Sequence, residues 1–131
     1  TVGAQVGEGS VSKRGKLKVH RVDCVIDCGI VINPDSVKAQ MEGSIIMGMS
    51  AALFEQITLE DGRVSQSNFD DYRMARLRDA PIVNVRVINS EHGPFGGDAG
   101  LPPTPPAITN AFFAVTGKRI RRLPIGKQKL V

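Results

Sequence analysis

Alternating apolar and polar positions at the start of the chain predict a β-hairpin. Residues 1–12 place β-branched side chains among small ones, which favours a strand. The Lys-Arg-Gly that follows is typical of a hairpin turn, with Gly15 supplying a positive φ. Residues 16–29 then alternate and become mostly apolar before Gly29. We therefore expect a second strand that ends at this glycine and is buried on both faces over its second half.

Residues 32–55 predict a long buried helix. Asn33 can cap it, Pro34 suits its first position, and Asp35 opposes the positive end of the helix dipole. Every fourth position is apolar, at Val37, Met41, Ile45 and Met49. Small residues also recur, at Gly43, Ser44, Gly48, Ser50, Ala51 and Ala52. They lower helix propensity, so we expect another backbone or a ligand to approach closely, and we interpret the methionines as core residues.

Shorter elements follow this helix. Residues 56–69 predict two strands joined by a turn at Asp61-Gly62. Residues 70–81 fit either a short helix or an extended loop that ends before a proline. Residues 82–90 alternate and predict a further strand.

A second amphipathic helix is predicted after a proline cluster. Thr104 can cap it, Pro105 suits its first position, and Gly117 suits its C-cap. Its apolar residues follow an i, i+3, i+4, i+7 pattern, at Ile108, Ala111, Phe112 and Val115. The order of elements indicates an α+β fold, with a mostly antiparallel sheet and two main helices packed on it. No linker divides the chain, so we expect a single domain over residues 1–131.

Composition and charge exclude some functions. The chain has 131 residues, 41% hydrophobic, and no apolar run near the roughly 20 residues that span a bilayer. Much of the basic excess behind the net charge of +4 lies in residues 13–18 and 118–129. These clusters fit a solvated hairpin tip and tail, or a nucleic-acid surface. Aromatic residues are only 5% and Trp is absent, so no stacking platform supports nucleic-acid binding.

The two cysteines, Cys24 and Cys28, do not predict a cofactor or metal site. On a strand they lie roughly 13 Å apart, whereas a disulfide needs Cα atoms within about 7 Å. We therefore expect two buried structural thiols. With only His20 and His92, this chain cannot form a His-based metal site by itself, and an iron–sulfur cluster would need four thiolates.

Asp98 is the first candidate for chemistry. It stands in a glycine-rich run, with Gly96, Gly97 and Gly100 around it. Glycines allow a backbone to approach another group closely, and the following helix N-terminus favours an anion. Local physics alone favours the alternative, in which Asp98 caps or buttresses its own loop.

Gln40 is the second candidate, because it falls inside the apolar, small-residue helix. A buried amide needs partners for its donors and acceptor. Those partners are either backbone groups or the polar edge of a cofactor. Residues 40, 43, 44 and 47 share a helix face on which Gly43 and Ser44 leave room beside the amide.

Two stretches in this order resemble a known family. "VDCVIDCGIVINPDSVKAQMEGSIIMGMSAALFE" and "GDAGLPPTPPAITNAFFAVTGKRIRRLP" are similar to the C-terminal part of the molybdenum-binding subunit of molybdenum hydroxylases, the xanthine dehydrogenase and aldehyde oxidase family. The similarity is strongest to the bacterial isoquinoline 1-oxidoreductase beta-subunit type, also described as membrane-bound aldehyde dehydrogenase. It covers nearly the whole chain from about Leu17 onward.

The resemblance implies a molybdenum–pyranopterin cofactor, in bacteria often the cytosine dinucleotide form. Gln40 in "QMEG" corresponds to the glutamine that contacts the pterin, and Gly43, Ser44 and Gly97 complete the expected cofactor-binding set. Asp98 in "GDAGLPP" takes the position of an essential Glu that removes a proton from a metal-bound hydroxide. The oxygen then attacks an aldehyde or N-heterocycle, and hydride passes to the metal centre.

Asp98 departs from the family pattern, because its side chain is one methylene shorter than Glu. A displacement of about 1 Å at a reacting centre can cost on the order of a hundredfold in rate. The alternative is therefore a non-catalytic paralogue that serves as an assembly or binding module.

The expected assembly is larger than this chain, which begins without Met. We expect a C-terminal segment of a larger subunit, which neither holds the cofactor nor turns over substrate alone. The resemblance implies three partners: an iron–sulfur electron-transfer subunit, the preceding domains of the same chain, and an aldehyde or heterocycle substrate. It favours a periplasmic or membrane-associated location, with a cytoplasmic one as the alternative.

Overall fold

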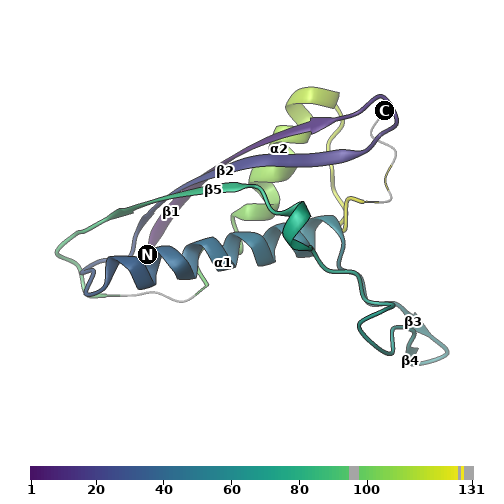
Figure 1. Ribbon diagram of the computed structural model, residues 1–131, viewed down its shortest axis with the longest axis horizontal. Coiled ribbons are helices and arrows are strands. Elements are labelled where there is room, and N and C mark those ends of the chain that lie inside the picture. The colour runs from purple at the N-terminus through teal and green to yellow at the C-terminus, as the bar shows by residue number, and fades with distance from the viewer. Residues whose placement is uncertain (95–97, 127, 129–131) are drawn as a thin grey trace.

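The computed structural model describes residues 1–94, 98–126 and 128, and its elements follow the predicted order (Figure 1). They are β1 (Val2–Val11), β2 (Leu17–Asp27), α1 (Pro34–Leu53), β3 (Leu59–Glu60), β4 (Arg63–Val64), a 3₁₀ turn (Leu77–Asp79), β5 (Ile82–Ile88) and α2 (Thr104–Thr116). The segment 70–81, for which the sequence favoured neither helix nor loop, is irregular except for that 3₁₀ turn.

The strands and helices form the predicted α+β fold. In the three-stranded sheet, of order β1-β2-β5, β1 pairs antiparallel with β2 and β2 pairs parallel with β5. β3 and β4 form a separate antiparallel hairpin through the predicted turn at Asp61 and Gly62, whose φ angles are 50° and 75°. Figure 1 shows this hairpin standing away from the sheet and the two long helices, at the lower right.

A β-bulge in β2 sets which of its side chains face the core. Glu8 pairs with Arg21 but Gly9 pairs with Val19, so His20 is an additional residue on β2. An extra residue reverses the alternation of a strand beyond it. Val19 before the bulge and the even-numbered residues after it therefore point to the same face.

The burial of β2 side chains follows this reversed alternation, and it corrects the expectation that the second half of the strand is buried on both faces. Val22, Cys24 and Ile26 are buried, whereas Val25 on the other face is 39% exposed. The second half of the strand is thus buried on one face, and the prediction of burial on both faces is wrong. The physical reason is that α1 and α2 contribute to one core against the inward face of β2.

Helix α1 begins as the sequence predicts. Asn33 is the N-cap, and its Oδ1 accepts a hydrogen bond from the backbone N–H of Ser36 at 3.1 Å. Met41 and Met49 lie in the core, but Met47 is 56% exposed, so the interpretation of the methionines as core residues is wrong for Met47. Within the described ranges, no helix is long and apolar enough to cross a membrane.

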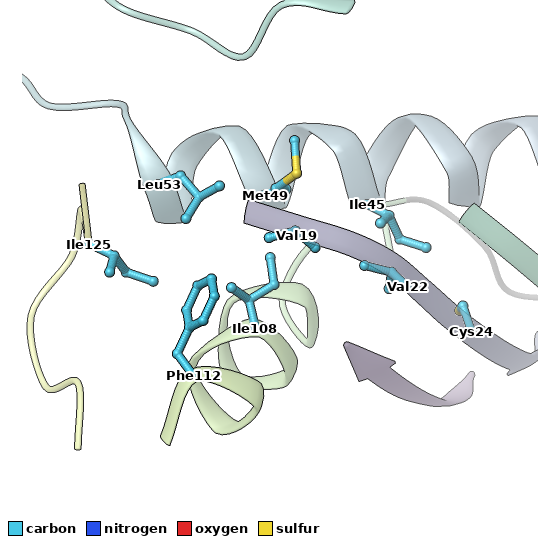
Figure 2. Packing of buried hydrophobic residues seen from close by; sticks show 9 residues of the cluster. All are labelled: Val19, Val22, Cys24, Ile45, Met49, Leu53, Ile108, Phe112 and Ile125. Carbon is cyan, nitrogen blue, oxygen red and sulfur yellow. The ribbon is translucent and has the colours of Figure 1, made fainter. Parts of the chain in front are cut away.

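The main core lies where α1, α2 and β2 meet (Figure 2). Its buried members are Val19, Val22, Cys24, Ile45, Met49, Leu53, Ile108, Phe112 and Ile125. Ile125 is completely buried, and the neighbouring backbone bonds to the end of α1, with Ile125 N–H donating to Ala52 O at 2.8 Å. The segment after α2 therefore closes one end of the core.

Helix α2 ends at the predicted residue but begins differently. Gly117 has φ 68° and forms the C-cap, as expected from its freedom in the left-handed region. Thr104 is the first residue of the helix rather than its cap, so that prediction is wrong. The reason is that the Thr104 hydroxyl faces the interior, where it meets Gln5 and Gly100.

Candidate functional site

The structure brings Gln40 and Asp98 together. Gln40 lies on the first half of α1, and Asp98 lies in the connection between β5 and α2. The Nε2 of Gln40 donates a hydrogen bond of 2.8 Å to Oδ1 of Asp98. The Asp98 carboxylate thus has a partner on another element, so it does more than buttress its own loop.

Both side chains are exposed, which corrects the expectation that Gln40 is buried. Met41 follows Gln40 directly and is buried. Consecutive residues on an α-helix are rotated by about 100°, so the two side chains leave the helix in different directions. Met41 packs into a second apolar cluster with Ile26 and Cys28, and Gln40 faces outward toward Asp98.

The other predicted cofactor-binding residues divide between surface and interior. A Cβ added at Gly43 would meet no atom within 4 Å, so open space adjoins this part of α1. Ser44 is buried and its hydroxyl donates to Gln40 O at 2.8 Å, so it supports the helix rather than facing outward. Gly97 lies outside the described residues.

Two turns lead the chain from Asp98 into α2. The N–H of Leu101 donates to Asp98 O at 3.0 Å, and the N–H of Thr104 donates to Leu101 O at 3.2 Å. Gly100 packs against α1, since an added Cβ would lie 3.1 Å from Ser44 Cβ and 3.3 Å from Met41 O. The expectation that a backbone approaches α1 closely is confirmed here.

Sequence reasoning missed a set of polar groups around the Gly100 carbonyl. Gln5 Nε2 donates to this oxygen at 2.8 Å, and the Thr104 hydroxyl lies 2.8 Å from it and 2.8 Å from Gln5 Oε1. Gln5 belongs to β1 and was read only as a strand residue. Local sequence carries no signal for the contacts of Gln5, because Gln5 and Gly100 are 95 residues apart in the chain.

A second missed contact joins the connections that follow β2 and β5. Asp27 Oδ1 accepts hydrogen bonds from Gly29 N at 3.0 Å and from the Ser90 hydroxyl at 2.7 Å. The Ile30 N–H also donates to His92 O at 3.0 Å. The Gly29 N–H, followed by the Ser90 hydroxyl, lowers the pKa of Asp27, because both bonds stabilise the carboxylate.

The two cysteines are buried and free, as predicted. Burial raises the pKa of the Cys24 thiol, and a hydrogen bond with Gln5 opposes this only in part, so the thiol stays neutral at pH 7. Across the described part of the chain, no group of three His, Cys, Asp or Glu side chains could hold a metal ion. The described site instead offers hydrogen-bonding groups, namely one amide and one carboxylate.

Comparison with known proteins gives the class of this chain. The family described as molybdopterin cofactor-binding domain matches residues 1–81, so the chain belongs to that family. This confirms the resemblance found in the sequence.

Individual relatives agree with this family. The isoquinoline 1-oxidoreductase subunit beta of Brevundimonas diminuta is 44% identical over 110 residues, which cover 83% of this chain and 14% of the relative. The membrane-bound aldehyde dehydrogenase [pyrroloquinoline-quinone] of Gluconacetobacter polyoxogenes is 33% identical over 112 residues, which cover 85% of this chain and 14% of the relative. This chain therefore spans only a small part of their length.

A solved structure supports the same fold. The crystal structure of quinoline 2-oxidoreductase from Pseudomonas putida 86 matches with a TM-score of 0.77 and 25% sequence identity. The match covers 86% of this chain and 16% of that chain. The arrangement of strands and helices described above is thus also present in a much longer oxidoreductase.

Proposed function

We propose that this chain forms part of the molybdenum-binding subunit of a hydroxylase that oxidises an aldehyde or an N-heterocycle. The observation that carries the proposal is the hydrogen bond of 2.8 Å between Gln40 and Asp98, beside the open surface at Gly43. Family membership supports a molybdopterin cofactor, and the relatives are named as isoquinoline and quinoline oxidoreductases and a membrane-bound aldehyde dehydrogenase.

The described residues fit a pterin as a hydrogen-bonding ligand. A glutamine amide has two N–H donors and one acceptor oxygen, and Asp98 takes one of the donors. The remaining donor and acceptor can pair with the amide-like edge of a pterin. Because nothing lies within 4 Å of an added Cβ at Gly43, a planar ligand can approach α1 beside Gln40.

Asp98 would act as the general base. Its Oδ1 accepts from Gln40, which orients the carboxylate and leaves Oδ2 as the atom that accepts a proton. The side chain is shorter than the glutamate of the family, but it still reaches Gln40 on α1. When bound, the molybdenum–pterin cofactor supplies the two-electron oxidation of the substrate.

The complete activity requires partners beyond this chain. We propose an iron–sulfur subunit as electron acceptor, the preceding domains of the parent chain as the other side of the site, and the cytosine dinucleotide form of the cofactor. The proposal includes a periplasmic or membrane-associated location and no nucleic-acid partner. The chain alone would bind no molybdenum, and metal analysis of the purified chain checks this directly.

Substitutions at Asp98 in the full-length parent protein test the proposed role. We expect Asp98→Asn to lower turnover of aldehydes or N-heterocycles by a factor of about 10² to 10⁴, because it removes the base while keeping the side-chain shape. Asp70→Asn, at another exposed aspartate outside the site, serves as the matched control. Equal activity of Asp98→Asn and the control, at equal molybdenum content, would contradict the assignment.

The replacement of Glu by Asp98 keeps a second function open, that of a non-catalytic assembly or binding module. Asp98→Glu in the parent protein separates the two functions. An active parent protein that loses turnover in Asp98→Asn supports the enzyme. A parent protein that loads no cofactor, or turns over no substrate until Asp98→Glu is introduced, supports the module.

A further inference from the structure

The Gly100 carbonyl joins the turn before α2 to β1, which lies far away in the sequence. Gln5 comes from β1, Thr104 from the start of α2, and Gly100 from the turn that follows Asp98. Gln5 Nε2 and the Thr104 hydroxyl each lie 2.8 Å from the Gly100 oxygen. The Thr104 hydroxyl also lies 2.8 Å from Gln5 Oε1, so the three polar groups form a closed triangle.

Two of the three members of this triangle are shielded from water. Thr104 has a relative exposure of 0%, Gly100 is buried, and Gln5 is half-buried. Hydrogen bonds between buried groups are costly to break, because each partner loses a bond that water cannot replace. The Gly100 carbonyl is therefore held more firmly than an exposed loop carbonyl would be.

The same residue is fixed from a second direction by α1. Gly100 rests against Ser44 and Met41, where an added Cβ would lie 3.1 Å and 3.3 Å from their nearest atoms. A Cβ at Gly48 would also lie 2.8 Å from Leu101 O. The Gly100 carbonyl is thus hydrogen-bonded to Gln5 of the sheet, and the Gly100 α-carbon packs against α1, the helix that includes Gln40.

We propose that Gln5 and Thr104 are positioning residues that set the reach of Asp98 toward Gln40. Both residues bond to the Gly100 carbonyl rather than to Asp98. By holding this carbonyl, they fix the distance between the turn and α1. The effect on catalysis rests on the function proposed above, whereas the effect on the turn does not. Asp98 is one methylene short for its family position, so the placement of its backbone matters more than it would for Glu.

Variants at these positions test the proposal in the 131-residue chain, without cofactor. Thr104→Val removes the hydroxyl and keeps the shape, Thr104→Ser restores the hydroxyl, and Gln5→Leu removes the amide. Thr116→Val is the matched control, because the Thr116 hydroxyl is a part-buried α2 group that donates to Phe112 O at 2.8 Å. Each variant is compared with the original chain by thermal unfolding.

Two NMR measurements report on the turn. One is hydrogen exchange of the Leu101 amide, which donates to Asp98 O, and the other is the position of the Gln40 side-chain amide resonances. We expect Thr104→Val and Gln5→Leu to speed exchange at Leu101 by about tenfold and to move the Gln40 resonances toward those of a free amide. Thr104→Ser should recover both, and Thr116→Val should change neither.

The results separate positioning from simple stabilisation. If Thr104→Val lowers the unfolding temperature but leaves Leu101 exchange and the Gln40 resonances like those of Thr116→Val, the proposal is wrong. If Thr104→Val does not fold, Gln5→Leu decides by the same two NMR measurements, and unchanged Leu101 exchange and Gln40 resonances in it contradict the proposal. If the parent protein proves to bind no molybdenum while the turn responds as expected, only the proposed function fails.

Discussion

Two glycines on α1 occupy opposite environments. At Gly48, an added Cβ would lie 2.8 Å from Leu101 O and 3.0 Å from Thr104 Cβ. At Gly43, it would meet nothing within 4 Å. One glycine lets the start of α2 pack against α1, and the other leaves the surface beside Gln40 open.

The difference shows that small residues on one helix can have different structural roles. The sequence pattern predicts close approach by either a backbone or a ligand, and it treats Gly43 and Gly48 alike. In the structure, a backbone segment, the turn before α2, packs against Gly48. Of these two glycines, only Gly43 has open space that a ligand could occupy. Alanine substitutions at the glycines of this region can therefore test the comparison.

The largest effect is expected from Gly48→Ala. The new Cβ must displace the Leu101 carbonyl, and overpacking of this kind costs about 1–3 kcal/mol, against a gain of about 1 kcal/mol in helix propensity. Because the displaced atom belongs to the backbone, the cost should lie at the upper end of this range, and we expect a net loss of about 1–2 kcal/mol in the free energy of unfolding, measured by urea denaturation. Unchanged or increased stability would mean that α1 and the turn are less closely packed than described.

Gly100→Ala should have a smaller effect of the same sign. Its Cβ would press on Ser44 Cβ at 3.1 Å and Met41 O at 3.3 Å, contacts that relax with shifts of a few tenths of an ångström. We expect a loss of about 1 kcal/mol in the free energy of unfolding and a weaker Gln40–Asp98 bond. A shift of the Gln40 side-chain amide resonances toward those of a free amide would report the second change, and no change in either quantity would argue against close packing of the turn.

Gly43→Ala should have the opposite sign. Since the site is open, alanine gains helix propensity without strain, and we expect an increase of about 0.5–1 kcal/mol in the free energy of unfolding. In the parent protein the same change should lower molybdenum content, because the added methyl group occupies the surface that the pterin would use. Higher stability with unchanged molybdenum content would show that the cofactor does not approach Gly43.

The smallest effect concerns acid stability near Asp27. Its pKa is lowered in the folded chain by the Gly29 N–H and the Ser90 hydroxyl, so the carboxylate stabilises the fold above its unfolded pKa of about 3.9. This contribution is lost as the pH falls through the lowered pKa. Asp27→Asn should therefore differ most from the original chain near pH 6 and least near pH 2.5 in urea denaturation, with Asp70→Asn as control.

Local signals predicted most of the fold. Asn33 followed by Pro34 gives the start of α1, and Gly117 gives the end of α2, because capping depends on neighbouring residues. The parallel pairing of β2 with β5 and the bulge at His20 were not predicted, because strand register depends on partners elsewhere in the chain.

The candidate site was predicted only in part. Asp98 and Gln40 were identified, but the exposure of Gln40 follows from how α1 packs against the sheet, which periodicity did not resolve at that position. Gln5 was missed because a glutamine on a strand is ordinarily a surface residue, and only the folded chain places it against Gly100. Thr104 was misread as the N-cap because Pro105, a residue common at the first helical position, follows it directly.

The parallel pairing of β2 and β5 has a consequence for how this scaffold can diversify. Asp27 and Ile88 are register partners, so the chain leaves both strands at the same sheet border, once toward the helix of Gln40 and once toward Asp98. Because the turn after Asp98 is anchored separately on β1 and α1, insertions or deletions between Ile88 and Asp98 would change this connector while leaving the acid, the amide and the packed interior in place. Under the function proposed above, a lineage could admit substrates of different size by changing the length of this one connector, without rebuilding the protein beneath it.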